Sequence, residues 1–428
     1  MMETPALVVQ PQQLIPVSEH LNTMAEIPPS RMFLIKKSLA AYRTKQPDSP
    51  IFDASQGDGG ASLPGVPAQI LQRAAELQQA HGTAYDMPYG TDEYRKAVAE
   101  KYWQLDETLG FGAPNIMATV GGRDALEKAY RAMLALGYGR QGDFILTTRV
   151  PWISYNWGPY GIGANVLLAP GNAAHGWALT PEAIRASVAF ARSLGREIAG
   201  MLITSPDNPT GNTLSLETQA SLGHAALDAG IPFVLYDWMY HYVTDEQPAD
   251  LNAFLRMFTP QQRQHLMFLD GLTKSLGASN IRNCHLIAAK NVIDFCVARA
   301  SHGVIPDFYS QAVAIAAYEM GYARAIEGIV TPTNASRVLL RNFAAQHPHL
   351  RTILGQGYYA FFDTRDFLTA RGWQDTEPLG QYLAEDYGLA IVPGVYFSTF
   401  GSTWIRFSYA TPPERTQGAL HRLAHALF

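Results

Sequence analysis

Several residues of this 428-residue chain that can do chemistry follow directly after segments with the pattern of buried strands. Lys274 comes shortly after one such hydrophobic run, and Arg282 follows on the same stretch of chain. Asp237 comes directly after another run, and Tyr240 stands close behind it. Ligands of an open α/β sheet bind beyond the carboxyl ends of its strands. We therefore expect an amine, a guanidinium, a carboxylate and a phenol to face one ligand.

Three further strand ends contribute complementary groups. Gly121, Gly122 and Arg123 open an expected helix, and the free backbone N–H groups of such a start attract an anion such as phosphate. Trp152 supplies a flat apolar ring, and Asn208 supplies an amide within an Asn-Pro-Thr-Gly run. Each group alone has an ordinary explanation: a glycine turn, a core indole, a tight turn or, for the carboxylate, a helix cap. Their common position after strands of one sheet indicates a single site.

Lys274 is the lysine that we expect to react. Lys290 is the one rival near a strand end, but the residue eight positions further on is not an arginine, whereas Lys274 has Arg282 at that spacing. An ordinary lysine is protonated at neutral pH. Partial desolvation beside other cations lowers the pKa of such an amine and frees it as a nucleophile.

The elements that must position these groups alternate between strands and helices from about residue 110 to about residue 290. We expect strands at Asn115–Val120, Asp143–Thr148, Ile198–Thr204, Pro232–Tyr236 and Leu266–Leu269. We expect helices at Ser30–Tyr42, Asp124–Leu136, Ser215–Asp228 and, as one long helix, Ser310–Gly328. This alternation predicts an α/β fold with a mostly parallel central sheet.

The last part of the chain changes character and predicts a smaller α+β domain. Its short strands are expected at Tyr358–Asp363, Leu389–Val392 and Thr403–Phe407. We therefore predict an N-terminal arm and helix over residues 1–50 that joins the small domain, a large domain over 51–309, and the small domain over 310–428.

Composition excludes several classes of function. Hydrophobic residues make up 47% of the chain and charged residues 16%, as in a globular protein. The formal net charge of −5 favours neither nucleic acid nor an anionic membrane as partner. The N-terminus has no signal-peptide pattern, and no run approaches the roughly 18 apolar residues of a membrane span. Two cysteines, Cys284 and Cys296, are too few for a disulfide framework or a thiolate metal site. We expect a cytoplasmic protein without a bound metal.

In this order, the motifs resemble those of the class I and II aminotransferases, which are fold-type I enzymes that use pyridoxal 5'-phosphate (PLP). The resemblance covers the chain from about residue 29 to its end. Any one motif is weak, but together, with matching local spacings, they leave little room for chance. They are Tyr85–Gly90 with Arg95, Gly121–Leu126, Trp152–Tyr155, Asn208–Gly211, Asp237–Tyr240, Lys274 with Arg282, and Trp404–Ser408 around Arg406.

The resemblance implies a role toward the cofactor ring for each of five residues. Lys274 is the Schiff-base lysine and carries the proton at the substrate α-carbon. Asp237 pairs with the pyridine nitrogen and so makes the ring an electron sink. Asn208 and Tyr240 bind the ring oxygen, and Trp152 stacks on the ring.

The resemblance also implies how the phosphate is held. The backbone N–H groups of Gly122 and Arg123, in the loop that begins at Gly121, bind it at a helix N-terminus, and Arg282 adds charge-assisted hydrogen bonds. Tyr85 is implied to contact the phosphate bound by the neighbouring subunit. The resemblance therefore implies a homodimer with shared active sites.

Arg406 is implied to bind the substrate α-carboxylate through its bidentate fork, although it could also be a surface arginine on an edge strand. The loop around Gly57, Gln56 to Gly60, resembles the family's substrate loop near that carboxylate. Dicarboxylate-specific members carry a second arginine where this chain has Ser301–Ser310, and this segment has none. The candidates that remain there to face the substrate are His302, Asp307 and Tyr309.

The chain departs from the family at one phosphate contact. Gly271 stands where the family has a serine three residues before the lysine, and Thr273, Ser275 or Arg123 could replace the missing contact. Glycines that usually flank the phosphate arginine are also replaced, by Asn280 and Cys284. The changes indicate a divergent member.

Three functions remain in competition at this point. The leading hypothesis is an aminotransferase that acts on an L-amino acid with a 2-oxo acid acceptor. The alternative is PLP-dependent elimination, replacement, cyclisation or oxidation of an amino acid on the same scaffold. The third is a PLP-binding regulator, which needs a DNA-binding domain that we do not expect ahead of motifs that begin so early.

Overall fold

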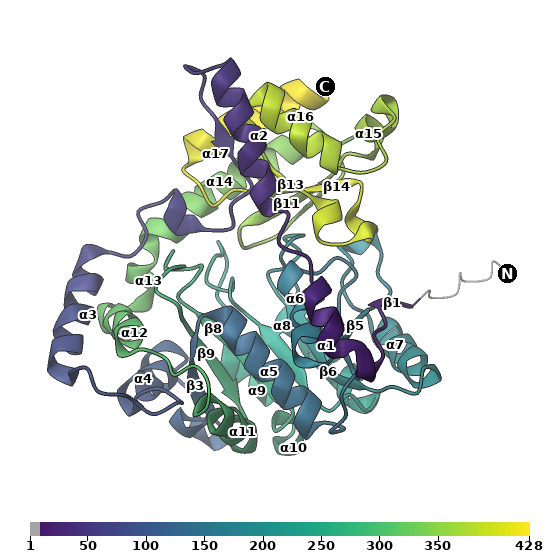
Figure 1. Ribbon diagram of the computed structural model, residues 1–428. Helices are drawn as coiled ribbons and strands as arrows, with labels where there is room; N and C mark the ends of the chain where they lie inside the picture. The colour runs from purple at the N-terminus through teal and green to yellow at the C-terminus, as the bar shows by residue number, and fades with distance from the viewer. Residues whose placement is uncertain (1–8) are drawn as a thin grey trace.

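The larger of two structural units is built on an eight-stranded sheet in this computed structural model, which describes residues 9–428 (Figure 1). Strands β5, β4, β6, β7 and β8 pair in parallel, whereas the β1–β5, β8–β9 and β9–β3 pairs are antiparallel. Because β9 is reversed against both of its neighbours, β3 runs in the same direction as the parallel group. The predicted α/β fold with a mostly parallel sheet is therefore confirmed. Across the sheet the order is β1 (Gln10–Gln13), β5 (Asn165–Leu168), β4 (Phe144–Thr147), β6 (Ile198–Thr204), β7 (Val234–Asp237), β8 (Leu266–Gly271), β9 (Asn283–Ala288) and β3 (Ile116–Val120).

Helices cover both faces of this sheet, which is why its central strands read as continuous hydrophobic runs. Every residue of β6, for example, is buried. One face packs against α5 (Gly122–Leu136) and α11 (Lys290–Ala300). Helices on the other face are α3 (Ala68–His81), α4 (Asp92–Lys96), α7 (Pro181–Ser193), α8 (Leu216–Asp228), α9 (Leu251–Arg256) and α12 (Phe308–Met320).

The smaller unit contains a four-stranded antiparallel sheet and lies above the larger one in Figure 1. Its strand order is β10 (Thr352–Leu354), β11 (Tyr359–Asp363), β14 (Trp404–Ser408) and β13 (Val392–Pro393). A short parallel pair, β2 (Phe52–Asp53) with β12 (Leu389–Ala390), ties residues near the start of the chain to this unit. Its helices are α2 (Met32–Lys45), α14 (Glu327–Gln346), α15 (Arg365–Arg371), α16 (Glu377–Tyr387) and α17 (Pro413–Leu427).

Two expected elements are divided in the structure. The long helix expected at Ser310–Gly328 is wrong as one element, because Gly321 takes a φ of 86° and ends α12. A single helical turn, α13 (Tyr322–Ala325), separates α12 from α14. The strand expected at Leu389–Val392 is split between β12 and β13, which belong to different sheets.

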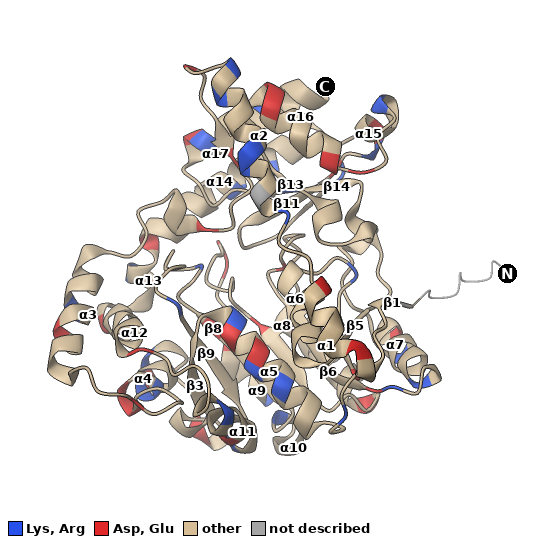
Figure 2. Ribbon diagram, viewed as in Figure 1, with Lys and Arg blue, Asp and Glu red and all other residues tan. Residues whose placement is uncertain are grey.

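The N-terminal segment contacts both units. Strand β1 pairs with β5 at the edge of the large sheet, whereas α2 packs against α16 of the small unit. The first eight residues of the predicted arm lie outside the described residues, and the division of the chain at residues 50 and 309 stays a prediction. Between residues 9 and 428, no helix has the length and apolar character to cross a membrane. Acidic and basic residues are interspersed over both units (Figure 2).

Candidate active site

A cavity of about 580 Å³ gathers most of the predicted site residues. Strands β3, β4, β6, β7 and β8 all deliver their carboxyl ends to the same edge of the sheet, and Arg406 on β14 reaches the cavity from the small unit. Two residues that were predicted to contact the cofactor, Gly121 and Tyr85, are not part of its wall. The predicted residues that line it are Gly57, Gly122, Arg123, Trp152, Asn208, Asp237, Tyr240, Lys274, Arg282 and Arg406.

Asp237 is the buried carboxylate of this cavity, and only 4% of the surface of this residue is exposed. Tyr155 of α6 (Ile153–Trp157) donates a hydrogen bond of 2.8 Å to its Oδ2, and the backbone N–H of Met239 donates one of 3.1 Å to its Oδ1. Burial raises the pKa of Asp237 to about 6. A cationic N–H group bound here would favour the ionised form of this carboxylate.

Lys274 projects its amine into the same cavity from the turn after β8. Its Nζ donates to the backbone carbonyl of Gly57 and lies 5.7 Å from the centre of the Tyr240 ring. Among residues 9–428 it makes no ion pair, whereas the exposed side chain of the rival Lys290 is paired with Asp294 on helix α11. Of these two lysines, Lys274 is therefore the one whose amine is available to a ligand in this cavity.

The start of α5 forms a cradle for an anion. Gly121 has a φ of 77°, and a side chain there would place its Cβ 2.2 Å from Nη2 of Arg282. The helix begins without a side-chain cap, so the N–H groups of its first turn are open to a ligand. Arg282, itself at a φ of 61°, donates to the carbonyls of Ser279 and Val120 and lines the cavity.

The structure explains why residue 271 is glycine rather than the family's serine. A Cβ at Gly271 would lie 2.6 Å from Cα of Cys284 on the neighbouring strand β9. Of the replacements considered, Ser275 is buried and hydrogen-bonded to Tyr322 at 2.6 Å. Thr273 lines the cavity, and its buried hydroxyl has no partner in the described chain. Arg123 also lines the cavity and stacks over Trp152 at 5.5 Å.

Arg406 lies on β14 with only 2% of its surface exposed. Nη1 donates to Oδ1 of Asn208 at 2.9 Å, and Nη2 donates to the carbonyl of Ser55 at 2.8 Å. Its Nε is buried without an acceptor in the described part of the chain. A buried guanidinium N–H without an acceptor is costly, so a ligand that carries an oxyanion fits this position.

Two residues of this site were not singled out from the sequence. In the sequence, Tyr155 is only the end of the Trp152 motif, and Tyr359 of β11 falls within the expected strand Tyr358–Asp363. The Tyr359 hydroxyl lies 2.9 Å from the Tyr240 hydroxyl, and its ring lies 4.3 Å from the guanidinium carbon of Arg406. A tyrosine in a β-strand carries no sequence signal for a site, because its neighbours here come from distant parts of the chain.

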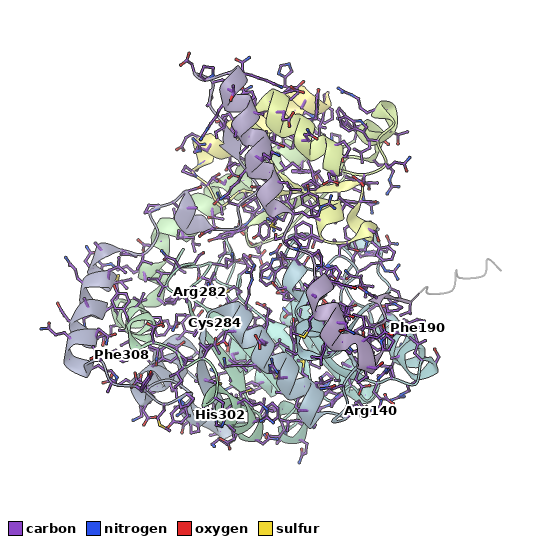
Figure 3. All side chains as sticks on the ribbon, viewed as in Figure 1. Arg140, Phe190, Arg282, Cys284, His302 and Phe308 are labelled. Carbon is purple, nitrogen blue, oxygen red and sulfur yellow. The ribbon has the colours of Figure 1, made fainter. Side chains whose placement is uncertain are left out.

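The remaining candidates lie away from the cavity of their own chain. Tyr85 is 97% exposed, in the loop between α3 and α4. Asp307 caps α12 by accepting from the N–H of Ser310, Tyr309 packs against the large core, and His302 lies at the end of the large unit away from the small one (Figure 3). None of these side chains is part of the cavity wall.

A second cavity, of about 510 Å³, adjoins the first and shares Arg123 and Leu126 with it. Residues 27–31 of the N-terminal segment close one side of this second cavity, and α6 closes another. It holds no lysine, so the reactive groups belong to the first cavity.

The chain is similar to known proteins in both sequence and fold. The family model described as "Aminotransferase class I and II" matches residues 52–423. The chain is 25% identical over 379 residues to the aspartate/prephenate aminotransferase of Thermus thermophilus, covering 83% of this chain and 87% of that one. It is 23% identical over 360 residues to the aspartate aminotransferase of Geobacillus stearothermophilus, covering 84% and 87%. A solved double mutant of Thermus thermophilus aspartate aminotransferase has the same fold, with a TM-score of 0.80 at 22% identity over 96% of this chain and all of that one.

Proposed function

The chain belongs to the class I and II aminotransferase family, and we propose that it moves the α-amino group of an L-amino acid to a 2-oxo acid with PLP held at Lys274. The observation that carries the proposal concerns one cavity and residues 9–428. Within that range, the cavity holds the amine of Lys274, which makes no ion pair, and the buried carboxylate of Asp237, which accepts hydrogen bonds from neutral donors only. An amine and a buried acid are the two groups that PLP chemistry needs at opposite ends of the cofactor ring.

The residues of the cavity fit PLP. The carboxylate of Asp237 would receive the protonated pyridine nitrogen, and Trp152 would cover a face of the ring. The first N–H groups of α5, Arg282 and the unpartnered hydroxyl of Thr273 would hold the phosphate. When bound, PLP supplies the electron sink that stabilises negative charge at the substrate α-carbon.

The ring oxygen of the cofactor would be held by two donors. The phenol of Tyr240 lines the cavity, and burial raises its pKa well above the ordinary value, so it keeps its proton at neutral pH. Asn208 accepts from Arg406 through its oxygen, which leaves its amide N–H₂ group to donate.

Lys274 would move the proton that transamination requires. Its Nζ would take the proton from the substrate α-carbon as a base and would then donate it as an acid. No carboxylate of the described chain pairs with this amine, which donates to the backbone carbonyl of Gly57.

Arg406 would orient the substrate for this proton transfer. The α-carboxylate would accept from its buried Nε and a neighbouring N–H, which satisfies the guanidinium and fixes the α-carbon near Lys274. Gly57, whose carbonyl accepts from Lys274, belongs to the loop that would close on the same carboxylate.

We further propose that the protein works as a homodimer. Tyr85 carries a ring that is 97% exposed and lies outside the cavity of its own chain. This supports a contact with the phosphate held by a second copy.

A screen of amino acids against the PLP-loaded protein tests the proposed function. Transamination converts the cofactor from its aldehyde to its amine form, with loss of visible absorbance and release of one 2-oxo acid per site. A 2-oxo acid added afterwards should restore the visible absorbance. Release of ammonia, with the aldehyde form retained, would support elimination instead and contradict the proposal.

A further inference from the structure

Tyr359 stands where the two units of the protein meet, and it contacts groups of both. It begins β11 of the small unit, and it lines the cavity with only 1% of its surface exposed. We propose that Tyr359 is a positioning residue with two separable parts: its hydroxyl directs the proton of Tyr240 toward the cofactor, and its ring holds Arg406. The proposal rests on the proposed function, since it assigns Tyr240 to the cofactor and Arg406 to the substrate.

The hydroxyl makes one hydrogen bond, to the hydroxyl of Tyr240 at 2.9 Å, and has no other hydrogen-bond partner within residues 9–428. In a hydrogen bond between two phenols, one hydroxyl donates its proton to the other oxygen. The accepting hydroxyl can then donate its own proton to a third group. If Tyr240 donates to the ring oxygen, Tyr359 must be the donor within the pair. A hydroxyl that accepts one hydrogen bond becomes a better donor in the next, so Tyr359 strengthens the bond that Tyr240 makes.

The position of this hydroxyl is closely defined by its surroundings. A Cβ added at Gly57 would lie 1.9 Å from the Tyr359 hydroxyl oxygen, so only glycine fits in the loop beside it. On the backbone side, a Cβ at Gly211 would lie 2.0 Å from the carbonyl oxygen of Tyr359. The motif glycines at 57 and 211 thus both make room for this one tyrosine.

The ring of Tyr359 has a different partner. The guanidinium carbon of Arg406 lies 4.3 Å from its centre, within the range of a cation–π contact. Such a contact holds the flat guanidinium without using any of its N–H groups. The ring therefore fixes the arginine while its buried Nε stays available to a carboxylate.

The charged and titratable groups around the tyrosine pair come from several elements. Lys274 follows β8, Asp237 ends β7, and Arg406 lies on β14. Tyr155 lies on α6. Tyr358, which precedes Tyr359 in the chain, donates to the backbone carbonyl of Lys274 at 2.5 Å. None of these groups hydrogen-bonds the Tyr359 hydroxyl, so removal of that hydroxyl acts first on Tyr240.

The test is a spectrophotometric pH titration of the PLP-loaded wild-type protein, four variants and one control variant. Tyr359→Phe removes the hydroxyl and keeps the ring, and Tyr359→Leu removes both. Tyr240→Phe alone and combined with Tyr359→Phe completes a double-mutant cycle. Tyr387→Phe is the matched control, because Tyr387 pairs with the hydroxyl of Tyr382 at 3.1 Å in the same unit, away from the cavity.

We expect Tyr359→Phe to raise the pKa read from the visible absorbance by roughly 0.2 to 0.6 pH unit, because a weaker donor stabilises the anionic ring oxygen less. The KM for amino acids should stay unchanged. The shift should vanish in the Tyr240→Phe background and be absent in Tyr387→Phe. Tyr359→Leu should in addition raise the KM of every amino acid roughly 5- to 10-fold, because Arg406 loses its ring contact.

A Tyr359→Phe titration identical to that of the wild type would overturn the inference, as would a shift that persists without the Tyr240 hydroxyl. In both cases the wild-type protein still shows a visible cofactor absorbance, so the proposed function survives. A wild-type protein that develops no visible absorbance with PLP would overturn the proposed function and this inference together.

Discussion

Tyr155 donates a 2.8 Å hydrogen bond to Oδ2 of Asp237, and both side chains are buried at the carboxyl end of β7. The second donor to this carboxylate, the N–H of Met239, is neutral as well. Asp237 makes no ion pair with any described residue, and burial raises its pKa to about 6. Burial therefore disfavours the ionised form of this carboxylate in the free protein, and a cationic partner would favour it.

Asp237→Asn should change the pH dependence of stability in the cofactor-free protein. Because the folded pKa of Asp237 is above its unfolded value, ionisation costs the folded state more, and stability falls as the pH rises from about 4 to about 6. The variant lacks this loss. The quantity to compare is the unfolding free energy of the variant minus that of the wild type, measured by urea denaturation. We expect this difference to be about 2 kcal/mol larger at pH 7.5 than at pH 4.5.

Asp245→Asn is the control of opposite sign when that pH profile is extended below pH 4. Hydrogen bonds from Arg341 hold the pKa of Asp245 at about 2, below its ordinary value. Its contribution to stability is therefore present at neutral pH and is lost as the pH falls toward 2. A pH profile in which both variants change in the same direction would contradict the assignment of Asp237 as a carboxylate raised by burial.

Lys274→Ala should abolish the visible absorbance that PLP gives when it is bound through an amine. The purified wild-type protein loaded with PLP is compared with the variant and with Lys290→Ala. Lys290 is exposed and paired with Asp294, so its loss should leave the spectrum unchanged. Retention of the absorbance in Lys274→Ala, or its loss in Lys290→Ala, would show that the reactive lysine is misassigned.

Arg406→Lys should reduce kcat/KM for every amino acid substrate by roughly 10- to 100-fold while PLP remains bound. A lysine keeps the charge but lacks the fork that engages a carboxylate and Asn208 together. The matched control is Arg415→Lys on α17, whose guanidinium donates to the carbonyl of Ile51 outside the cavity. Steady-state kinetics with an unchanged kcat/KM would contradict a carboxylate-binding role for Arg406.

Thr273→Val should weaken cofactor binding, whereas Ser275→Ala should lower stability. The unpartnered hydroxyl of Thr273 faces the cavity, so its loss should raise the dissociation constant of PLP roughly tenfold with little change in folding. Ser275 is hydrogen-bonded to buried Tyr322, so its loss should cost about 1 kcal/mol of stability and leave PLP affinity intact. Equilibrium dialysis and urea denaturation separate the two, and the reverse pattern would show that Ser275 makes the phosphate contact.

Sequence reasoning predicted the core of the fold where the signal is local. Strand β6 was predicted with its observed bounds, Ile198–Thr204, because a strand buried on both faces is a continuous apolar run. Strands β1, β5 and β9 of the large sheet were not predicted. Strands β1 and β5 have four residues each and little periodicity of their own, and the pairing of all three depends on partners elsewhere in the chain. The break at Gly321 was missed because a lone glycine is also tolerated inside helices.

The sequence by itself determined which groups meet at the site. Asp237 ends a strand of one mostly parallel sheet, and Lys274 and Asn208 follow others. The carboxyl ends of the parallel strands share an edge. That inference needs only local patterns and their order along the chain.

Only the tertiary structure decided how these groups are supported. Tyr359 meets Tyr240 across 119 residues of chain, and Tyr155 meets Asp237 across 82. Glycine at 271 is required by the approach of Cys284 on another strand. Each relationship depends on how distant elements pack and pair, and no local pattern records the register in which two strands or two units meet.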